Sequence, residues 1–151
     1  MRDRREEIMT RMLVALRGVK GVSTLARNKT EISDEAALPA ILLLDGNEVA
    51  SINDPPSRPV TATRRMTLTP DIRIICATSS DSVGKQINAL RMGAINALIT
   101  DETLVALTAD ATGLRYEGSV VTLKSGRVMT MDLSLQFSCS YYLTRPDITG
   151  A

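Results

Sequence analysis

The segment VMTMDLSLQFSCSYYLT, residues 128–144, has an apolar side chain at every second position, and mostly Ser and Thr between them. A period of two is typical of a β-strand with one buried face and one polar face, whereas a helix would scatter the same side chains around its circumference. The segment therefore predicts a strand about three times the usual length of roughly 5–6 residues. Its apolar face consists of Met129, Met131, Leu133, Leu135, Phe137, Cys139, Tyr141 and Leu143.

The length of this strand raises a question about its surroundings. At ~3.3 Å per residue it would span on the order of 50 Å. A compact chain of 151 residues has an expected radius of gyration of only ~15 Å. We therefore expect the strand either to bend at a bulge or to project beyond its own core. The second case would suit a subunit that pairs with copies of itself.

The same period of two returns in residues 64–77, RRMTLTPDIRIICA, which predicts a second long strand. Pro70 has no N–H to donate to a ladder, so it indicates a sheet edge or a bulge. Residues 114–123 predict another strand, irregular at Gly118, and a turn at residues 124–126 leads from it into the long strand.

A shorter apolar run, AILLL at residues 40–44, predicts a buried strand. Asp45-Gly46 follows it and is a strong signal for a β-hairpin, with residues 47–52 as the returning strand. We prefer a turn to a calcium loop here, because the acid spacing and the closing Glu of an EF-hand are absent.

Two stretches carry apolar residues at helical spacing. The first runs from Asp3 to about residue 17 and opens with the capping-box spacing of Asp3 and Glu6. The second covers about residues 83–98, and Thr100 and Asp101 can cap a further helical segment through about residue 107.

Together these elements predict an α+β fold. We expect a two-layer sandwich with a largely antiparallel or mixed sheet of about four to six strands and two main helices on one face. Residues 1–151 form a single domain. Residues 51–63, SINDPPSRPVTAT, predict a mobile loop or arm that becomes ordered in an assembly, with a plain surface loop as the alternative.

The composition argues against several classes of function. The chain has no His and a net charge of +1, and it lacks nucleotide-binding, nucleophile-elbow and Cys/His metal motifs. We predict no catalytic residue, no cofactor and no metal. Cys76 and Cys139 fit core positions as free thiols, with a disulfide as the alternative if their strands are neighbours. The longest apolar run is too short to span a membrane.

The basic residues leave two interpretations open. Arg58, Arg64 and Arg65 lie on the proline-rich loop and its exit, whereas Lys124 and Arg127 flank a hairpin tip. Solvated surface is the simplest reading. Alternatively, two basic projections could line a DNA channel or meet an acidic partner. The candidate assembly-interface residues are Asn53, Arg58, Arg64, Arg65, Lys124 and Arg127.

Several sequence segments, in their order and spacing along the chain, resemble those of a known family, and together they cover nearly the whole chain. They are REEIMTRMLVALRGVKGV, ARNKTEISDEAALPAILLLDG, RRMTLTPDIRII, QINALRMGAINALITDETLVAL, LRYEG and the terminal YYLTRPD. The chain resembles the tail terminator (tail completion) proteins of long-tailed bacteriophages, prophages and gene transfer agents.

The resemblance implies a structural virion protein without catalytic residues. Such a protein forms a homo-hexameric ring that caps the tail tube, ends its polymerisation and joins the tail to the head-closure or connector protein. Genomic DNA would pass through the ring lumen. The ring would sit at the head-proximal end of the tail after assembly in the host cytoplasm, with no membrane involved. The alternatives are another head–tail connector or tail tube ring protein, a DNA-binding module using the basic residues, or a small enzyme.

Overall fold

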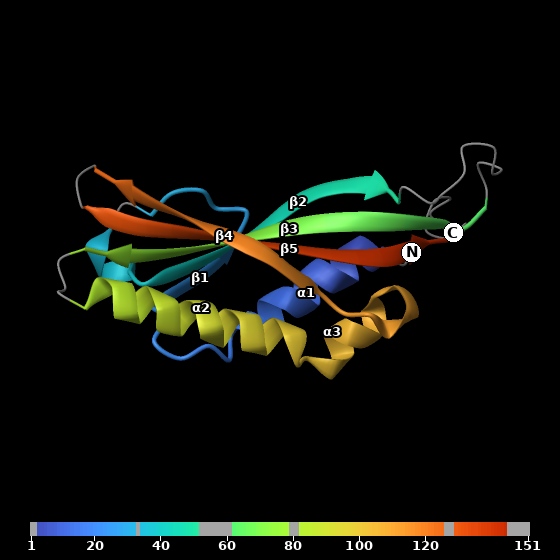
Figure 1. Cartoon of the computed structure of the whole chain (residues 1–151), viewed down its shortest axis with the longest axis horizontal. Helices are drawn as coiled ribbons and strands as arrows, with labels where there is room; N and C mark the ends of the chain where they lie inside the picture. The colour runs from blue at the N-terminus through green and yellow to red at the C-terminus, as the bar shows by residue number, and fades with distance from the viewer. Residues whose placement is uncertain (1–2, 33, 52–61, 79–81, 126–128, 145–151) are drawn as a thin grey trace.

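The computed structural model describes residues 3–32, 34–51, 62–78, 82–125 and 129–144. One five-stranded sheet has the order β1-β2-β3-β5-β4, in which β1 is parallel to β2 and the other pairs are antiparallel. The helices cover one face of this sheet (Figure 1), which confirms the α+β sandwich. The elements are α1 (Arg4–Leu16), β1 (Thr24–Arg27), η1 (Glu35–Ala37), β2 (Ala40–Ala50), β3 (Arg64–Ala77), α2 (Val83–Ile99), α3 (Glu102–Leu107), η2 (Ala109–Ala111), β4 (Arg115–Lys124) and β5 (Thr130–Leu143).

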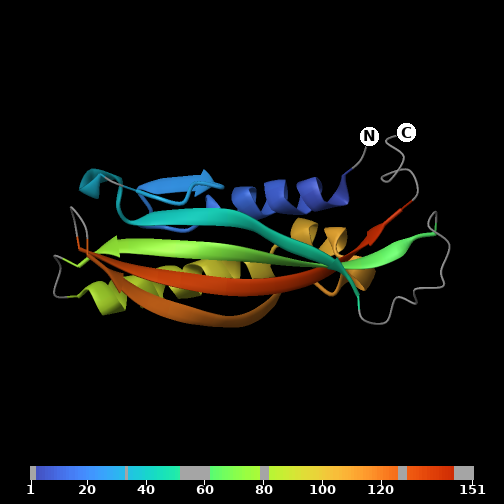
Figure 2. The same ribbon diagram turned by 90° about the horizontal axis from the view of Figure 1, so that it is seen from above.

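The two predicted long strands are present and lie next to each other. β3 and β5 have 14 residues each and keep one register along their shared length, from Arg64 opposite Leu143 to Ala77 opposite Thr130. At ~3.3 Å per residue the pair is roughly 46 Å long. Figure 2 shows both strands running the length of the molecule. The long strand therefore does not outgrow the sheet, because its neighbour is equally long.

The helix-facing side of the sheet carries the main core. Phe137 and Tyr141 of β5 are each 1 % exposed and are the largest side chains in it. Most of the other core residues are aliphatic, and burying one aliphatic side chain contributes ~1.5–3 kcal/mol. Their number compensates for the scarcity of aromatic residues. The helices contribute the buried residues Ile8, Met9, Met12 and Leu16 from α1, Ile87, Leu90, Ala94, Ile95 and Leu98 from α2, and Leu104 from α3.

The opposite face is covered at one end only. Ala40, Leu42 and Ile75 are buried there, and Arg73 on the same face donates to the Thr30 carbonyl at 2.6 Å. The connection between β1 and β2 passes over this end of the sheet (Figure 1). The rest of this face is mostly polar, with Thr67, Thr69, Gln136, Ser138 and Ser140, although Val49 and Val120 are exposed on it.

The predicted hairpin at Asp45-Gly46 is wrong. β2 continues through both residues from Ala40 to Ala50, and the register with β3 shifts between Leu44 and Asn47. Two residues of β2 therefore oppose Pro70 of β3, which is a β-bulge. A bulge and a hairpin turn use the same positive φ at glycine, 71° at Gly46, so the dipeptide alone does not distinguish them.

The location of Pro70 decides between the two predictions for that residue, a sheet edge or a bulge. Pro70 lies in β3, which has neighbours on both sides in the sheet, so the prediction of an edge strand is wrong. The prediction of a bulge is confirmed, and the bulge lies on the neighbouring strand β2. The predicted irregularity at Gly118 is also confirmed, because the register of β4 with β5 shifts between Tyr116 and Gly118.

Candidate functional site

The sequence-predicted interface residues are divided between the two ends of the sheet. Arg64 and Arg65 begin β3, whereas Lys124 ends β4 opposite Thr130, which in turn lies opposite Ala77, the last residue of β3. The two basic groups are therefore about 40 Å apart along the strands. Three further candidates, Asn53, Arg58 and Arg127, lie outside the described residues, as do residues 52–61 of the arm predicted at 51–63.

At each end one of the described cations faces a carboxylate. Arg65 lies 3.6 Å from Asp110, and the same carboxylate accepts a hydrogen bond from the hydroxyl of Tyr142 at 2.9 Å. At the other end, Lys124 lies 3.2 Å from Asp132. Among the described residues, cations that face carboxylates at separate ends do not form a continuous basic track of the kind that binds phosphate backbones.

Asp132 is the most enclosed acid in this arrangement, with 5 % of the residue exposed. It accepts hydrogen bonds from the Arg73 guanidinium as well as contacting Lys124. The hydrogen bonds to Asp132 raise the pKa of Arg73. A buried carboxylate with two cationic partners stabilises the outer face of β3, β4 and β5 locally.

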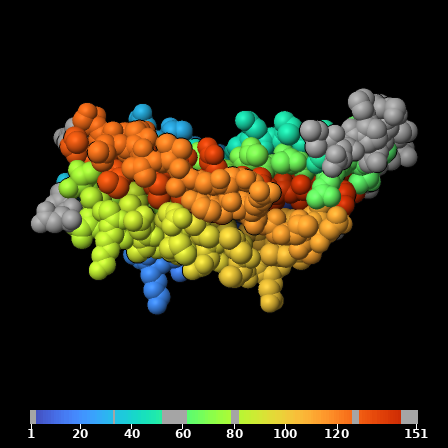
Figure 3. Space-filling model, viewed as in Figure 1, coloured from blue at the N-terminus to red at the C-terminus, as the bar shows by residue number. Residues whose placement is uncertain are grey.

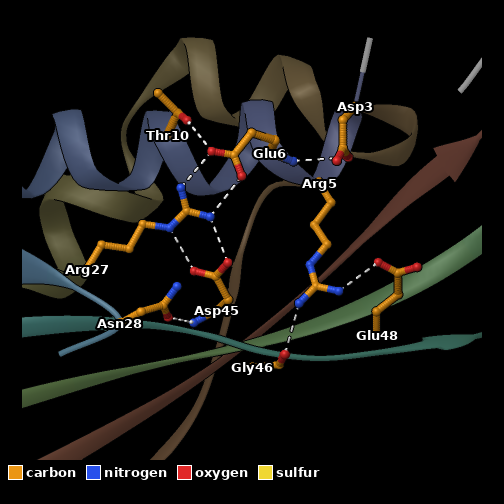
Figure 4. A network of polar contacts seen from close by, with 9 residues as sticks. All are labelled: Asp3, Arg5, Glu6, Thr10, Arg27, Asn28, Asp45, Gly46 and Glu48. Atoms are coloured by element: carbon orange, nitrogen blue, oxygen red, sulfur yellow. Dashed lines mark hydrogen bonds and ion pairs between the residues drawn. The ribbon is translucent and has the colours of Figure 1, made fainter. Parts of the chain in front are cut away.

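At the edge of the sheet formed by β1 and β2, hydrogen bonds occupy several backbone groups of β2 beyond the end of β1. The backbone N–H of Asn28 donates to the Leu43 carbonyl at 2.7 Å, and the Asn28 side chain accepts from the Asp45 N–H at 3.1 Å. Arg5 donates to the Gly46 carbonyl at 3.1 Å (Figure 4). These contacts occupy backbone groups that an incoming strand would need.

Salt bridges hold helix α1 against this edge. Arg27 at the end of β1 reaches both Glu6 of α1, at 2.7 and 2.9 Å, and Asp45 of the bulge, at 2.8 and 2.7 Å. Arg5 of α1 donates to Glu48 at 3.2 Å (Figure 4). The hydrogen bonds from Arg27 lower the pKa of Glu6 and of Asp45.

The opposite edge, formed by β4, has no such protection among the described residues. Every residue from 119 to 124 is exposed, and Val120, Val121 and Leu123 are 58 %, 57 % and 62 % exposed. Residues 119–123, SVVTL, contain no charge and no proline, the devices that usually blunt an edge strand. Figure 3 shows β4 as a ridge on the molecular surface above α2.

Only the first part of β4 is anchored to the helical layer. The ring of Tyr116 lies 5.5 Å from the Phe137 ring in a tilted arrangement. The Arg91 guanidinium of α2 lies over the Tyr116 ring at 5.5 Å, a cation–π contact. The part of the strand beyond Gly118 is therefore held by its pairing with β5 and offers its outer edge to solvent.

The sequence predicts a strand here, but the exposed apolar side chains of this strand were not among the candidate residues. The candidates included the charged Lys124 at the tip but not Val120, Val121 or Leu123. A signal was present, because two adjacent valines place an apolar side chain on both faces of the strand. A strand buried on one face alone does not need that pattern.

The chemistry available to the chain is limited. Burial raises the pKa of the Cys76 thiol to about 11 and that of Cys139 to about 12, so both are protonated at neutral pH. Cys76 lies opposite Met131, eight residues along β5 from Cys139 and therefore about 26 Å away. A disulfide is thus impossible, and both thiols are free.

No other site with catalytic or membrane character emerges from the described residues. They contain no cluster of three or more His, Cys, Asp or Glu that could hold a metal ion. None of their helices has the length and hydropathy of a membrane span.

An open groove of about 600 Å³ runs between α1 and α3. Its principal polar contact is structural, because Arg11 donates to both oxygens of Asp101 at 2.9 and 2.8 Å, and Asp101 in turn caps α3 through the Leu104 N–H. The Thr10 hydroxyl donates to the Glu6 carboxylate at 3.3 Å. Glu6 also accepts from Arg27, and these hydrogen bonds lower its pKa, which makes it a weak base. Its lining is Asp3, Glu6, Glu7, Thr10, Arg11, Val14, Thr103 and Leu107.

Comparison with known proteins gives one informative result. No protein-family model and no curated protein matches the chain. Among solved structures, a chain in the virion of a native gene transfer agent (GTA) particle is similar, with a TM-score of 0.53 and 12 % sequence identity. The similarity covers 89 % of this chain and 92 % of that chain. At this identity the similarity shows a shared fold.

Proposed function

We propose that the protein is a structural component of a phage-like virion and that it acts there as the tail terminator. The observation that carries this proposal is the shared fold with a gene transfer agent virion chain over 89 % of this chain and 92 % of the other. Nearly complete coverage in both directions means that the whole domain is shared and not one motif. The resemblance in sequence phrases to tail terminators supports the same role.

In this role the protein forms a homo-hexameric ring on the finished tail tube. Its partners are its own copies, the tail tube protein and the head-closure or connector protein, and genomic DNA passes through the lumen. The unprotected β4 edge supports an assembly role, because an exposed strand edge is a ready template for pairing. Asn53, Arg58, Arg64, Arg65, Lys124 and Arg127 remain the proposed contact residues.

A role as another connector or as a tail tube ring protein is the alternative within the same class. A DNA-binding module is less well supported, because Arg65 and Lys124 each face a carboxylate. An enzymatic role has little chemistry to draw on, since the chain has no His and both thiols are buried.

Purified protein mixed with tail tubes and viewed by negative-stain electron microscopy tests the proposal. We expect six-fold rings at one end of each tube, and tubes that stop growing once the ring has bound. Incorporation along the whole tube would assign the protein to the tube itself, and binding to the connector alone would assign it to head closure. A protein that stays monomeric and never binds tube ends would contradict a virion ring altogether.

A further inference from the structure

The two edges of the sheet differ in a way that bears on self-association. At the β1–β2 edge, Asn28 and Arg5 occupy the Asp45 N–H and the Gly46 carbonyl, and salt bridges tie α1 to the same part of the edge. Along β4, residues 119–124 are all exposed and the strand pairs only with β5 within the described residues. A molecule with one open edge can satisfy it with the same edge of a second copy, which requires a two-fold axis.

The sequence of the β4 edge is compatible with such self-pairing in one antiparallel register. With Thr122 opposite the partner's Thr122, residues of the same sheet face lie opposite each other, as strand geometry requires. Val121 and Leu123, which lie opposite Leu133 and Met131 within the chain, then face the partner's Leu123 and Val121. The register thus forms two apolar cross-strand pairs and one Thr–Thr pair, which are favourable combinations.

The charges are compatible with this register as well. Lys124 is the single charged residue of the segment 119–124, and Asp132 at 3.2 Å already partners it. In the proposed register Lys124 lies opposite the partner's Val120 and not opposite another cation. The aliphatic stem of the lysine can cover that valine while its ammonium group stays with Asp132.

We propose that two copies of the free protein pair through β4 about a two-fold axis, which joins their sheets into one continuous sheet. The occupant of the open edge is therefore a second copy of this chain. A six-residue edge buries less than the ~800 Å² per partner of a standard stable interface, so we expect a weak dimer. Because an edge strand accepts one neighbour, the dimer covers β4 until another contact replaces it. The proposal goes beyond the virion role and does not depend on it.

A single cysteine at the centre of the register tests the two-fold geometry. Thr122→Cys should form a disulfide-linked dimer under mild oxidation, because the two central residues lie directly opposite each other. Val49→Cys is the matched control. Val49 is 59 % exposed on β2, away from β4, and its cysteine variant should remain monomeric on a non-reducing gel at the same concentration.

Sedimentation measurements test the energetic part. Val121→Lys should raise the dimer dissociation constant by about tenfold or more, since both apolar cross-strand pairs are lost. Val49→Lys, an equally exposed site, should leave it unchanged. Circular dichroism confirms that both variants are folded.

Two results would overturn the proposal. One is a Thr122→Cys variant that cross-links no faster than Val49→Cys. The other is a dissociation constant that Val121→Lys does not change. If the protein still forms rings on tail tubes in that case, β4 pairing fails while the terminator role stands. If dimers form but rings never do, the reverse holds.

Discussion

Gly46 decides the course of β2 at a single residue. Its φ of 71° is a left-handed conformation, and a Cβ atom there would lie 1.9 Å from the carbonyl oxygen of Thr69. Only glycine fits both constraints. The bulge that Gly46 permits changes the strand register, with the result that Asp45 and Glu48 both contact arginines.

Gly46→Ala should therefore lower the free energy of unfolding by about 2–4 kcal/mol, because the methyl group forces the backbone of β2 away from β3. Urea denaturation followed by circular dichroism measures the change. Gly84→Ala is the control. A Cβ at Gly84 meets nothing within 4 Å, and alanine favours the helix, so stability should stay the same or rise by up to about 1 kcal/mol. Equal effects of the two substitutions would show that the bulge is not sterically constrained.

At the scale of elements, the contact between α1 and the sheet combines a buried apolar stripe with an exposed polar clamp. Ile8, Met9 and Met12 of α1 are fully buried against the sheet. Arg27 connects the helix to the bulge through Glu6 and Asp45. The apolar stripe supplies most of the free energy, because partly exposed ion pairs contribute little individually. The clamp specifies the position of the helix relative to the bulge.

The clamp makes stability sensitive to acid. The pKa of Glu6 and that of Asp45 are lower in the folded protein than their ordinary values of 4.5 and 3.8. As pH falls, the two carboxylates are therefore protonated in the unfolded state before they are protonated in the folded state. Their contribution to stability is present above the ordinary pKa values and is lost as pH falls through the lower pKa values of the folded protein. Arg27→Met should flatten the decline of the melting temperature between about pH 5 and pH 3.

The matched control for the clamp is Arg17→Met. Arg17 is exposed at the C-terminal end of α1, and its replacement should leave the acid slope of the wild-type protein unchanged. An Arg27→Met variant with the wild-type slope would mean that other carboxylates control acid unfolding.

At the scale of the whole molecule, the sheet is long and its helical layer lies on one side only. One sheet edge is partly occupied by Asn28 and Arg5, the β4 edge is exposed, and the described contact candidates Arg64, Arg65 and Lys124 lie at strand ends. This asymmetry favours a molecule that assembles with others through edges and ends, without a central binding pocket. The two thiols lie far apart in the shared core and report on its integrity.

Neither thiol should react with Ellman's reagent in the native protein, because Cys76 is fully buried and Cys139 is 5 % exposed. Both should become reactive only as the chain unfolds globally, since they occupy one cooperative core. A time course across a urea series measures this. The Val49→Cys variant supplies an exposed thiol that should react at once. Fast reaction of one native cysteine without denaturant would reveal a region that opens independently.

The sequence by itself determined most of the elements, with β2 as the exception, because their patterns depend on local chain geometry. The period of two located β3 and β5, and helical spacing located α1 and α2. Asp3 and Asp101 were predictable as helix caps, and both accept the expected backbone N–H. The α+β class followed from the order of these elements.

The tertiary structure alone decided how the elements meet. Asp45-Gly46 became a bulge because Pro70 lies opposite, and local sequence does not specify what a strand faces. The same holds for the partly occupied edge at Asn28 and for the open edge at Val120, Val121 and Leu123. Burial of an apolar strand residue depends on whether a neighbour covers it, and such non-local contacts are established only when distant segments of the chain pack together.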